Sequence, residues 1–227
     1  MFLTDMPAMF IDKTLVIADL HIGITRELYE SGISIPSQVE KLAKTLNKLG
    51  SQTKANRLVI LGDLKHKVPG ISYQELKEVP EFLSLLEFKE VVIVKGNHDG
   101  GIENMVESKD VFVKKSFSMD DFYFTHGHRK ANTKKRNIVI GHNHPHVQFR
   151  DELGALYTEP IWIIGKAKIK NQNHNLILMP AFNELCGATI VNRDSLLGPI
   201  AKKIRDAHVF LLDGTDIGLI KDLKFKK

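Results

Sequence analysis

Five short polar clusters along the chain carry side chains of the kinds that bind metal ions, and each follows an apolar segment. They are Asp19-Leu20-His21, Gly62-Asp63, Gly96-Asn97-His98-Asp99, Thr125-His126-Gly127-His128 and Gly141-His142-Asn143-His144. Imidazole, carboxylate and amide groups together suit divalent Mn, Fe, Zn, Co or Ni. A single open catalytic metal needs about three protein ligands, and the clusters offer more than that. Two ions roughly 3.5–4 Å apart, bridged by a carboxylate, would use them all.

The spacing inside the clusters favours a common site. Asp19 and His21 are two residues apart, as are His142 and His144, and residues two apart in an extended chain face the same side. Glycines at positions 62, 96, 127 and 141 permit tight turns and close approach of the backbone. No cysteine occurs near the clusters, because the only one is Cys186. We therefore expect no structural zinc site with thiolate ligands.

Short apolar runs predict the strands, and their distribution divides the chain into two halves. The first half alternates strands with helices, which favours a parallel sheet covered by helices. The second half contains mostly strands, separated by polar or glycine-containing turns. The predicted strands are residues 15–18, 58–61, 91–94, 122–124, 138–140, 146–149, 161–164, 176–179 and 209–212. We expect one domain over residues 1–227, of the α/β class, with two packed sheets flanked by helices.

Capping residues and apolar spacing predict three helices. One runs from Pro36 to Leu49, with Gly50 just past its end. A capping box at Ser72 begins the second, and Pro80 is expected to kink or split it. Residues 195–205 are expected to form the third helix, and residues 221–227 a basic tail.

The composition is that of a globular protein with an excess of positive charge. The 227 residues are 43% hydrophobic and 26% charged, with a net charge of +5, which favours an anionic partner or, alternatively, a solvated lysine-rich surface. No apolar run approaches the ~20 residues that span a bilayer, and the N-terminus lacks the basic and apolar regions of a signal peptide. A single cysteine allows no disulfide within the chain. We expect a cytoplasmic protein that binds no membrane.

The ordered clusters resemble the motifs of the calcineurin-like metallophosphoesterases, which run D-x-H, G-D, G-N-H-D/E, H and G-H-x-H. Every element is present between residues 19 and 144. The resemblance implies a four-layer αββα fold and a hydrolase of phosphoester bonds with two divalent ions, for which Mn is expected and Fe, Zn, Ni or Co are alternatives. It makes His98 the catalytic histidine and Asp63 the bridge between the ions. The implied metal ligands are Asp19, His21, Asp63, Asn97, His126, His142 and His144.

A finer resemblance is to small stand-alone prokaryotic phosphoesterases that are described as SbcD-like or as predicted nucleases. It rests on the stretch Asp19-Leu20-His21-Ile22-Gly23, on Gly32 and Pro36, and on Pro180-Ala181-Phe182-Asn183. This resemblance implies DNA-repair proteins as partners. It does not predict the oligomeric state.

The chemistry of such a site follows from its charge. Metal binding lowers the pKa of a bridging water, so that hydroxide exists at neutral pH and can attack phosphorus in line. His98 is expected to stabilise the transition state or to protonate the leaving oxygen. Asp99 is assigned to the catalytic group as the residue that orients His98, with an ordinary turn residue as the alternative.

Departures from the phosphoprotein phosphatases of that family favour a phosphodiester substrate. Those enzymes continue the second motif as G-D-x-x-D-R-G and place arginine before G-N-H, whereas this chain reads Leu64-Lys65-His66-Lys67 after Asp63 and has Lys95 before Gly96. The bidentate arginines that suit a dianionic monoester are therefore missing. His66 resembles a histidine of the SbcD-like nucleases. We expect it to contact the substrate phosphate or the leaving group, the alternative being a histidine that packs in its loop.

The segment between the fourth and fifth clusters is basic, and predicted ligands tether it at both ends. We expect it to lie near the metals, where its cations could follow a nucleic-acid backbone, a solvated turn being the alternative. These cations are Arg129, Lys130, Lys134, Lys135 and Arg136. The resulting hypothesis is a phosphodiesterase that acts on DNA or RNA as a nuclease. A small-molecule phosphodiesterase or phosphatase acting on cyclic nucleotides or nucleotide-derived esters, and a non-catalytic scaffold, are the alternatives.

Overall fold

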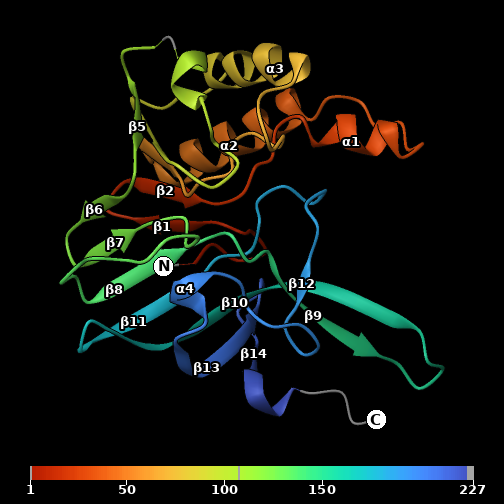
Figure 1. Cartoon of the computed structure of the whole chain (residues 1–227), viewed down its shortest axis with the longest axis vertical. Helices are drawn as coiled ribbons and strands as arrows, with labels where there is room; N and C mark the ends of the chain where they lie inside the picture. Colours follow the sequence, from red (N-terminus) through yellow and green to blue (C-terminus); the bar gives the residue numbers. More distant parts are fainter. Residues whose placement is uncertain (1, 107, 224–227) are drawn as a thin grey trace.

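Two β-sheets packed face to face carry the architecture, and helices cover the outer face of the first (Figure 1). The computed structural model describes residues 2–106 and 108–223. The core between the sheets joins apolar side chains of both, among them Val16 and Val59 from the first sheet and Val139 and Trp162 from the second. The predicted α/β class, with two packed sheets flanked by helices, is confirmed.

The first sheet has the strand order β1-β2-β3-β4-β5. Its strands are β1 (Met9–Ile11), β2 (Thr14–Ile17), β3 (Arg57–Ile60), β4 (Glu90–Val94) and β5 (Val111–Lys114), and β2 to β5 are parallel. The helical elements of this half are α1 (Ile24–Glu30), α2 (Val39–Thr53), α3 (Tyr73–Ser84) and the 3-10 turn η1 (Ile102–Met105). Alternate strand residues such as Leu15 and Ile60 pack against α2 and α3 in a second core. The sheet is thus buried on both faces, as parallel strands require.

The second sheet is mixed and larger, with the order β12-β9-β10-β11-β8-β7-β6 and a branch through β13 and β14. Its strands are β6 (Phe117–Met119), β7 (Phe122–Phe124), β8 (Asn137–Ile140), β9 (Pro145–Arg150), β10 (Leu156–Ile169), β11 (Gln172–Leu178), β12 (Thr189–Ile190), β13 (Ile204–Leu211) and β14 (Asp216–Leu219). The short helix α4 (Gly198–Ala201) and the 3-10 turn η2 (Ile220–Asp222) belong to this half. Ile200 and Ala201 of α4 help to cover its outer face.

Two predictions about the first-half helices were wrong in detail. Gly50 lies inside α2, which continues to Thr53. The residue is a glycine for packing and not for ending the helix, because a Cβ there would stand 2.7 Å from the Phe88 ring. Of the two effects expected of Pro80, a kink or a split, the split does not occur, because α3 runs unbroken from Tyr73 to Ser84. The fully buried Val79 and Phe82 hold this helix against the first sheet, and such packing offsets the loss of one backbone hydrogen bond.

The helix predicted for residues 195–205 was also wrong. Only Gly198–Ala201 is helical, and strand β13 begins at Ile204. Ala207 and Val209, two residues apart, both pack into the outer core beside β10. This spacing is that of a strand and not that of a helix. The basic tail predicted for residues 221–227 is described only as far as residue 223, and residues 224–227 lie outside the described part of the chain.

Candidate metal centre

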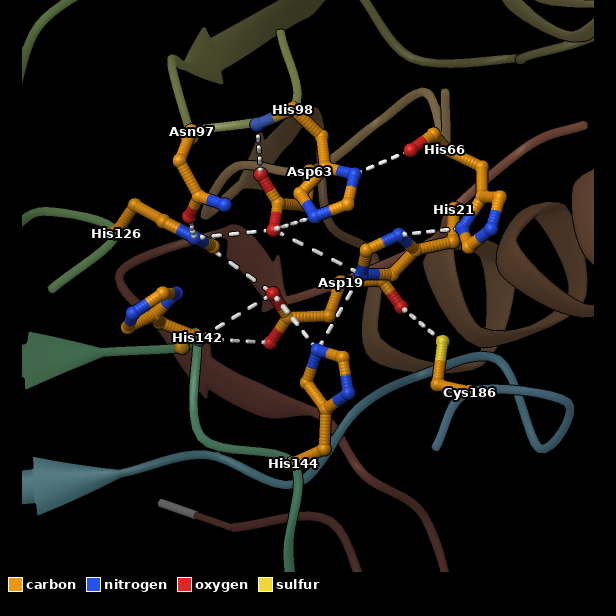
Figure 2. A network of polar contacts seen from close by, with 12 residues as sticks. Asp19, His21, Asp63, His66, Asn97, His98, His126, His142, His144 and Cys186 are labelled. Carbon is orange, nitrogen blue, oxygen red and sulfur yellow. Dashed lines mark hydrogen bonds and ion pairs between the residues drawn. The ribbon is translucent and has the colours of Figure 1, made fainter. Parts of the chain in front are cut away.

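The five polar clusters converge at one edge of the two sheets, each directly after a strand (Figure 2). Asp19 and His21 follow β2, Asp63 follows β3, Asn97 and His98 follow β4, His126 follows β7, and His142 and His144 follow β8. Parallel pairing brings the ends of β2, β3 and β4 together, and likewise the ends of β7 and β8. The site therefore lies at the carboxyl ends of parallel strands, as expected for an α/β sheet.

One group of potential ligands gathers around Asp19, His21 and Asp63. Each offers an atom within 4.8 Å of those of the others, and His21 Nε2 lies 3.7 Å from Asp63 Oδ2. His144 joins this group, with Nε2 3.3 Å from His21 Nε2 and 3.5 Å from Asp19 Oδ1. Two imidazole nitrogens that face one another beside two carboxylates form a donor set that suits a divalent cation.

A second group consists of Asp63, His126 and His142, whose ligand atoms also lie within 4.8 Å of one another. His126 Nε2 is 3.2 Å from Asp63 Oδ2 and 3.1 Å from Asn97 Oδ1. The other nitrogen of this ring, Nδ1, lies 2.7 Å from the Leu61 carbonyl oxygen, which fixes the ring so that Nε2 faces the centre. Asp63 is the member that both groups share.

The backbone at these ligands is not extended. This contradicts the prediction that residues two apart, such as Asp19 and His21, face the same side because they lie in an extended chain. Five of the seven predicted ligands have a positive φ in the left-handed region, namely Asp19 (58°), His21 (45°), Asp63 (49°), His142 (71°) and His144 (40°). The paired side chains do enter one site, but through tight turns at the strand ends. Aspartate and histidine are among the residues that tolerate this conformation best.

Glycines make room for the ligands at three of these turns. A Cβ on Gly62 would collide with the His126 ring, and a Cβ on Gly96 would collide with the Asp63 carboxylate. On Gly141 it would stand 2.7 Å from Asp19 Oδ2. The predicted need for close backbone approach is thus met by direct contact with the ligand side chains.

Burial and neighbouring charges set the protonation of the metal-free centre. Burial lowers the pKa of His21 to about 3 despite the nearby Asp19 and Asp63, and burial with the charge of His126 lowers that of His142 to about 4. Burial alone would also lower the pKa of His126, but its hydrogen bond to Asp63 and the charges of Asp19 and Asp63 raise it to about 9. Burial would lower the pKa of His144 as well, but the charge of Asp19 and hydrogen bonds to Asp19 and to the Gly187 carbonyl raise it above its usual value. The metal-free centre therefore holds protons preferentially on His126 and His144, while the rings of His21 and His142 are neutral and free to act as ligands.

The comparison with protein families identifies the chain. The family model described as calcineurin-like phosphoesterase matches residues 13–179. The chain is a calcineurin-like phosphoesterase. Membership makes it a metal-dependent hydrolase of phosphoester bonds that uses divalent ions. No curated protein matches the sequence.

Several solved structures resemble this phosphoesterase, two of which are a nuclease and a phosphoesterase. The nuclease MPE of Pseudomonas putida is 22% identical, with a TM-score of 0.53 over 88% of this chain and 85% of that one. Yfce, a phosphoesterase from E. coli, is 17% identical, with a TM-score of 0.41 over 90% of this chain and 96% of that one. At such identities, the likeness to the nuclease shows a shared fold.

His98 stands at the rim of the centre, and its orientation does not depend on Asp99. Its backbone N–H donates to Asp63 Oδ1 at 2.8 Å, its Nδ1 contacts the carbonyl oxygen of His66, and its Nε2 lies 3.9 Å from Asp63 Oδ2. The buried Asp99 instead accepts from the backbone N–H groups of Gly96 and Lys65. The structure thus corrects the prediction that Asp99 orients His98: Asp99 fixes the turn, and a carbonyl group orients the ring.

His66 contacts a predicted ligand and an acid that the motifs did not reveal. Its Nδ1 is 3.1 Å from His21 Nδ1, and its Nε2 is 2.8 Å from Glu27 Oε2. The contacts form a chain from a carboxylate through one imidazole to a second imidazole in the centre. Ligating histidines are commonly oriented by such outer partners. His66 was predicted to contact substrate, and it also lines a cavity beside His98, but its ring is engaged by His21 and Glu27.

The loop that carries His66 is held by two buried charged residues. Glu75 accepts from the backbone N–H groups of His66 at 2.9 Å, Lys67 at 2.5 Å and Ser72 at 2.6 Å, and from the Ser72 hydroxyl at 2.9 Å. The predicted capping box is confirmed, but it does more than start α3. The fully buried Lys65 donates to the carbonyl oxygens of Lys67 and Gly70. These bonds fix the loop against the metal centre.

A cavity of about 500 Å³ opens next to His66 and His98. The loop just described forms one wall, and α1 with its preceding turn forms another. Its lining residues are Gly23, Arg26, Glu27, Glu30, His66, Lys67, Val68, Ile71, Ser72, Tyr73 and His98. Arg26 is already paired with Glu30 at 2.7 Å, so this arginine has a partner within the wall.

The basic segment does not lie wholly at the metals, which corrects the prediction. Arg129 and Lys130 are exposed and follow closely on His126. Lys135 and Arg136, however, lie at the opposite end of the second sheet. The Lys135 ammonium contacts the Asp120 carbonyl in the turn before β7, and the Arg136 carbonyl accepts from Asn175 near the start of β11. The segment crosses the outer face of the sheet, where Ala131 is buried, and so joins the two ends.

Cys186 lies against the centre, although the sequence places it far from every cluster. Its Sγ is 3.6 Å from the Asp19 carbonyl oxygen and within 4.8 Å of ligand atoms of His21 and His144. The segment after β11 returns along β2, where the Phe182 N–H donates to the Ala18 carbonyl. Burial, with the charges of Asp19 and Asp63, raises the pKa of the Cys186 thiol well above its usual value. The expectation of no cysteine near the clusters was therefore wrong: Cys186 is distant from them in the sequence but close to them in the structure.

His128 lies behind His126 rather than in the centre. Their ring centroids are 5.2 Å apart, and neither ring nitrogen of His128 has a hydrogen-bond partner among the described residues. It is His126, the residue implied by the family motif, whose Nε2 faces Asp63. Within the described chain, no helix has the length and apolar character that crossing a bilayer demands.

Proposed function

We propose that this phosphoesterase is a two-metal phosphodiester hydrolase acting on DNA or RNA, with Mn²⁺ as its working ion. The observation that carries the two-metal part is the position of Asp63. Its carboxylate belongs to both groups of potential ligands, 3.7 Å from His21 Nε2 on one side and 3.2 Å from His126 Nε2 on the other. A shared carboxylate between two imidazole groups is the arrangement that two neighbouring divalent ions need.

The residues present fit such a pair of ions. One ion would be held by Asp19, His21, Asp63 and His144, and the other by Asp63, Asn97, His126 and His142. Low pKa values keep His21 and His142 neutral, and ligand imidazoles must be unprotonated. When bound, the ions would polarise the phosphate and lower the pKa of a water between them.

The chain's own groups would supply orientation and a proton. His98 is held through its backbone N–H and its Nδ1, which leaves Nε2 directed toward the centre. From that position Nε2 would donate to a phosphate oxygen or to the leaving oxygen. His66 would keep His21 in the orientation that directs its Nε2 to the centre, because His66 contacts the other nitrogen of His21, and Glu27 in turn holds the His66 ring.

Two observations support a diester over a monoester. Arg26, which lines the cavity beside His98, is paired with Glu30, and Lys95, which stands where the phosphoprotein phosphatases have arginine, is paired with Glu103 at 2.6 Å. Each cation is thus partly neutralised by a carboxylate, which weakens its attraction for a dianionic phosphate. Nucleic acid is supported by the exposed Arg129 and Lys130 beside the centre and by the net charge of +5. The similar nuclease from Pseudomonas putida is consistent with this substrate.

The test is Asp63→Asn, which keeps the acceptor for the His98 N–H but removes the bridging charge. Hydrolysis of bis-p-nitrophenyl phosphate and of labelled oligonucleotides should fall at least 1000-fold with Mn²⁺, while circular dichroism shows an unchanged fold. Full activity of this variant would refute the site assignment. A panel of Mn²⁺, Mg²⁺, Ni²⁺ and Zn²⁺ on the wild type identifies the ion.

A small-molecule phosphodiesterase is the second candidate, because a cavity of about 500 Å³ is large enough for a mononucleotide. Turnover of cyclic nucleotides is compared with turnover of single- and double-stranded oligonucleotides under the same metal conditions. A protein that hydrolyses cyclic nucleotides and leaves every oligonucleotide intact would establish this second function and exclude the nuclease.

A further inference from the structure

A cationic groove lies at the end of the second sheet that is opposite the metal centre. Its volume is about 390 Å³, and it is formed where β10 ends, β11 begins and β13 starts. Four cations line it from three separate parts of the chain. Its lining residues are Arg136, Lys166, Ala167, Lys168, Asn173, His174, Asn175, Arg205 and Asp206.

The strand register sets the cations in rows. Lys166 lies opposite Arg205 of β13 on one side and opposite Asn175 of β11 on the other. Lys168 is two residues further along β10, so it projects from the same face as Lys166. The cations are thus spaced along one rim rather than scattered, as a repeating anion would require.

These cations have no acidic partner among the described residues. Lys166, Lys168, Arg136 and Arg205 are all exposed and take part in no ion pair, and Asp206 is the one carboxylate in the lining. Elsewhere on the surface, Arg26, Arg57 and Lys95 are each paired with a glutamate. Unpaired charge in one groove leaves a positive potential that favours an anion.

His174 belongs to the lining of the groove, but its ring lies on the other face of the sheet from the lysines. It pairs with Ala167, whose side chain lies in the outer core, whereas Lys166 pairs with Asn175. The His174 Nδ1 lies 2.7 Å from the Lys135 carbonyl oxygen, and this contact holds the chain just before Arg136 against the start of β11. The exposed cations, not this histidine, are therefore the groups that would contact an anion.

The basic segment connects this groove with the metal centre. It leaves the centre after His126, carries Arg129 and Lys130, crosses the outer face of the sheet and reaches the groove at Arg136. From Arg136 to His142 the chain spans at most roughly 20 Å at about 3.3 Å per residue. One strand of duplex DNA carries a phosphate every ~3.4 Å of axis, so roughly six nucleotides would cover that distance.

We propose that this groove is a second binding site for the phosphate backbone of the nucleic-acid substrate, about six nucleotides away from the bond that is cleaved. The inference rests on the proposed nuclease function and adds to it a minimum substrate length. Lys166, Lys168 and Arg205 bind the distal phosphates. Oligonucleotides too short to reach them are held by the metal centre and its neighbouring cations alone.

The test compares the triple variant K166Q/K168Q/R205Q with K44Q/K48Q/K77Q, which removes three exposed cations from α2 and α3. Binding of fluorescein-labelled 20-mers, single- and double-stranded, is followed by anisotropy, and cleavage is followed for a 20-mer and a 4-mer. The groove variant should bind the 20-mer at least tenfold more weakly, and its dependence of log K on log salt should be shallower by about two to three, since each phosphate contact contributes ~0.7–0.9. Cleavage of the 4-mer and of bis-p-nitrophenyl phosphate should match the wild type.

Other outcomes have distinct meanings. Wild-type binding and cleavage of the 20-mer by the groove variant would overturn the groove while the nuclease function stands. An equal loss from the α2/α3 variant would reduce the effect to net charge and would likewise overturn the groove. A wild type that hydrolyses the small diester but neither binds nor cleaves any oligonucleotide would refute the nuclease function, and the groove with it.

Discussion

The loop that carries His66 should depend on one buried carboxylate, that of Glu75. Its Oε1 accepts the N–H groups of His66 and Lys67, and its Oε2 accepts the N–H and hydroxyl of Ser72. The substitution Glu75→Gln keeps the shape of the side chain but replaces one acceptor oxygen by an NH₂ group. The single oxygen of glutamine can therefore accept either from the N–H groups of His66 and Lys67 or from Ser72, but not from both sets.

The expected cost follows from the hydrogen bonds. With its oxygen toward His66 and Lys67, the substituted glutamine would present its NH₂ to Ser72, whose hydroxyl can rotate to accept but whose N–H cannot. One buried N–H is then unpaired, at about 1–3 kcal/mol, and the two remaining bonds lose their charge assistance. We expect a loss of about 3 kcal/mol in the free energy of unfolding. For a domain of this size, this corresponds to a fall in Tm of roughly 6–12 °C.

Thermal and urea unfolding followed by circular dichroism measure this loss, with Glu81→Gln as the control. Glu81 is an exposed residue on the same helix, and its variant should stay within about 0.5 kcal/mol of the wild type. Turnover should fall with Glu75→Gln, since the same loop supplies the carbonyl group that orients His98. A variant with wild-type Tm and turnover would show that the four hydrogen bonds do not hold the loop.

Three further predictions concern the metal centre. Glu27→Gln should weaken Mn²⁺ binding about 10- to 100-fold in calorimetry, because it loosens the partner chain of His21; unchanged affinity would remove Glu27 from that chain. Gly96→Ala should lose metal binding while Gly100→Ala, where a Cβ meets nothing within 4 Å, should not; a fully loaded Gly96→Ala protein would contradict the collision with Asp63. The pKa of His126 is raised to about 9, so a metal must displace its proton below that pH: apparent affinity should rise about tenfold per pH unit from 7 to 9. An affinity for the metal that does not change between pH 7 and pH 9 would refute the raised pKa of His126. The same raised pKa stabilises the metal-free protein below pH 6.5, and that stabilisation is lost as the pH rises through 9.

The sequence predicted the strands that lead into the ligand clusters to within about one residue at each end, whereas the strand predicted for residues 161–164 runs from Leu156 to Ile169 and the ends of the helices were missed. The runs that precede Asp19, Asp63 and Asn97 are short and apolar, and polar residues follow them closely. The change from apolar to polar residues was therefore enough to place the clusters at the ends of buried strands. Gly50 and Pro80 misled because local rules ended or broke helices that tertiary packing continues. At Gly50 the Phe88 ring takes the place of a side chain, and no local pattern reveals that contact.

The contacts between distant residues were the part that the sequence could not supply. Glu27 has no motif, and only the packing of α1 beside the His66 loop brings its carboxylate within 2.8 Å of His66. Cys186 comes to the centre because the chain after β11 hydrogen-bonds along β2. The tether argument for the basic segment failed at Arg136 for a simple reason: two fixed ends limit how far a loop can reach, yet a segment of this length can still cross a whole sheet and return along β8.

The left-handed backbone at the ligands gives the centre its shape before any ion binds. Such a conformation costs of order 1–3 kcal/mol at a non-glycine residue and persists only where surrounding contacts impose it. Here the clusters impose it on one another. The N–H of His21 donates to the Asp63 carbonyl at 2.8 Å, the N–H of Asp19 donates to the Gly62 carbonyl at 3.2 Å, and the N–H of His142 donates to the Asp19 carboxylate at 3.0 Å. Because these bonds hold the turns at Asp19, Asp63 and His142 against one another, a metal ion meets ligands that are already oriented, and little of its binding energy is spent on ordering the chain.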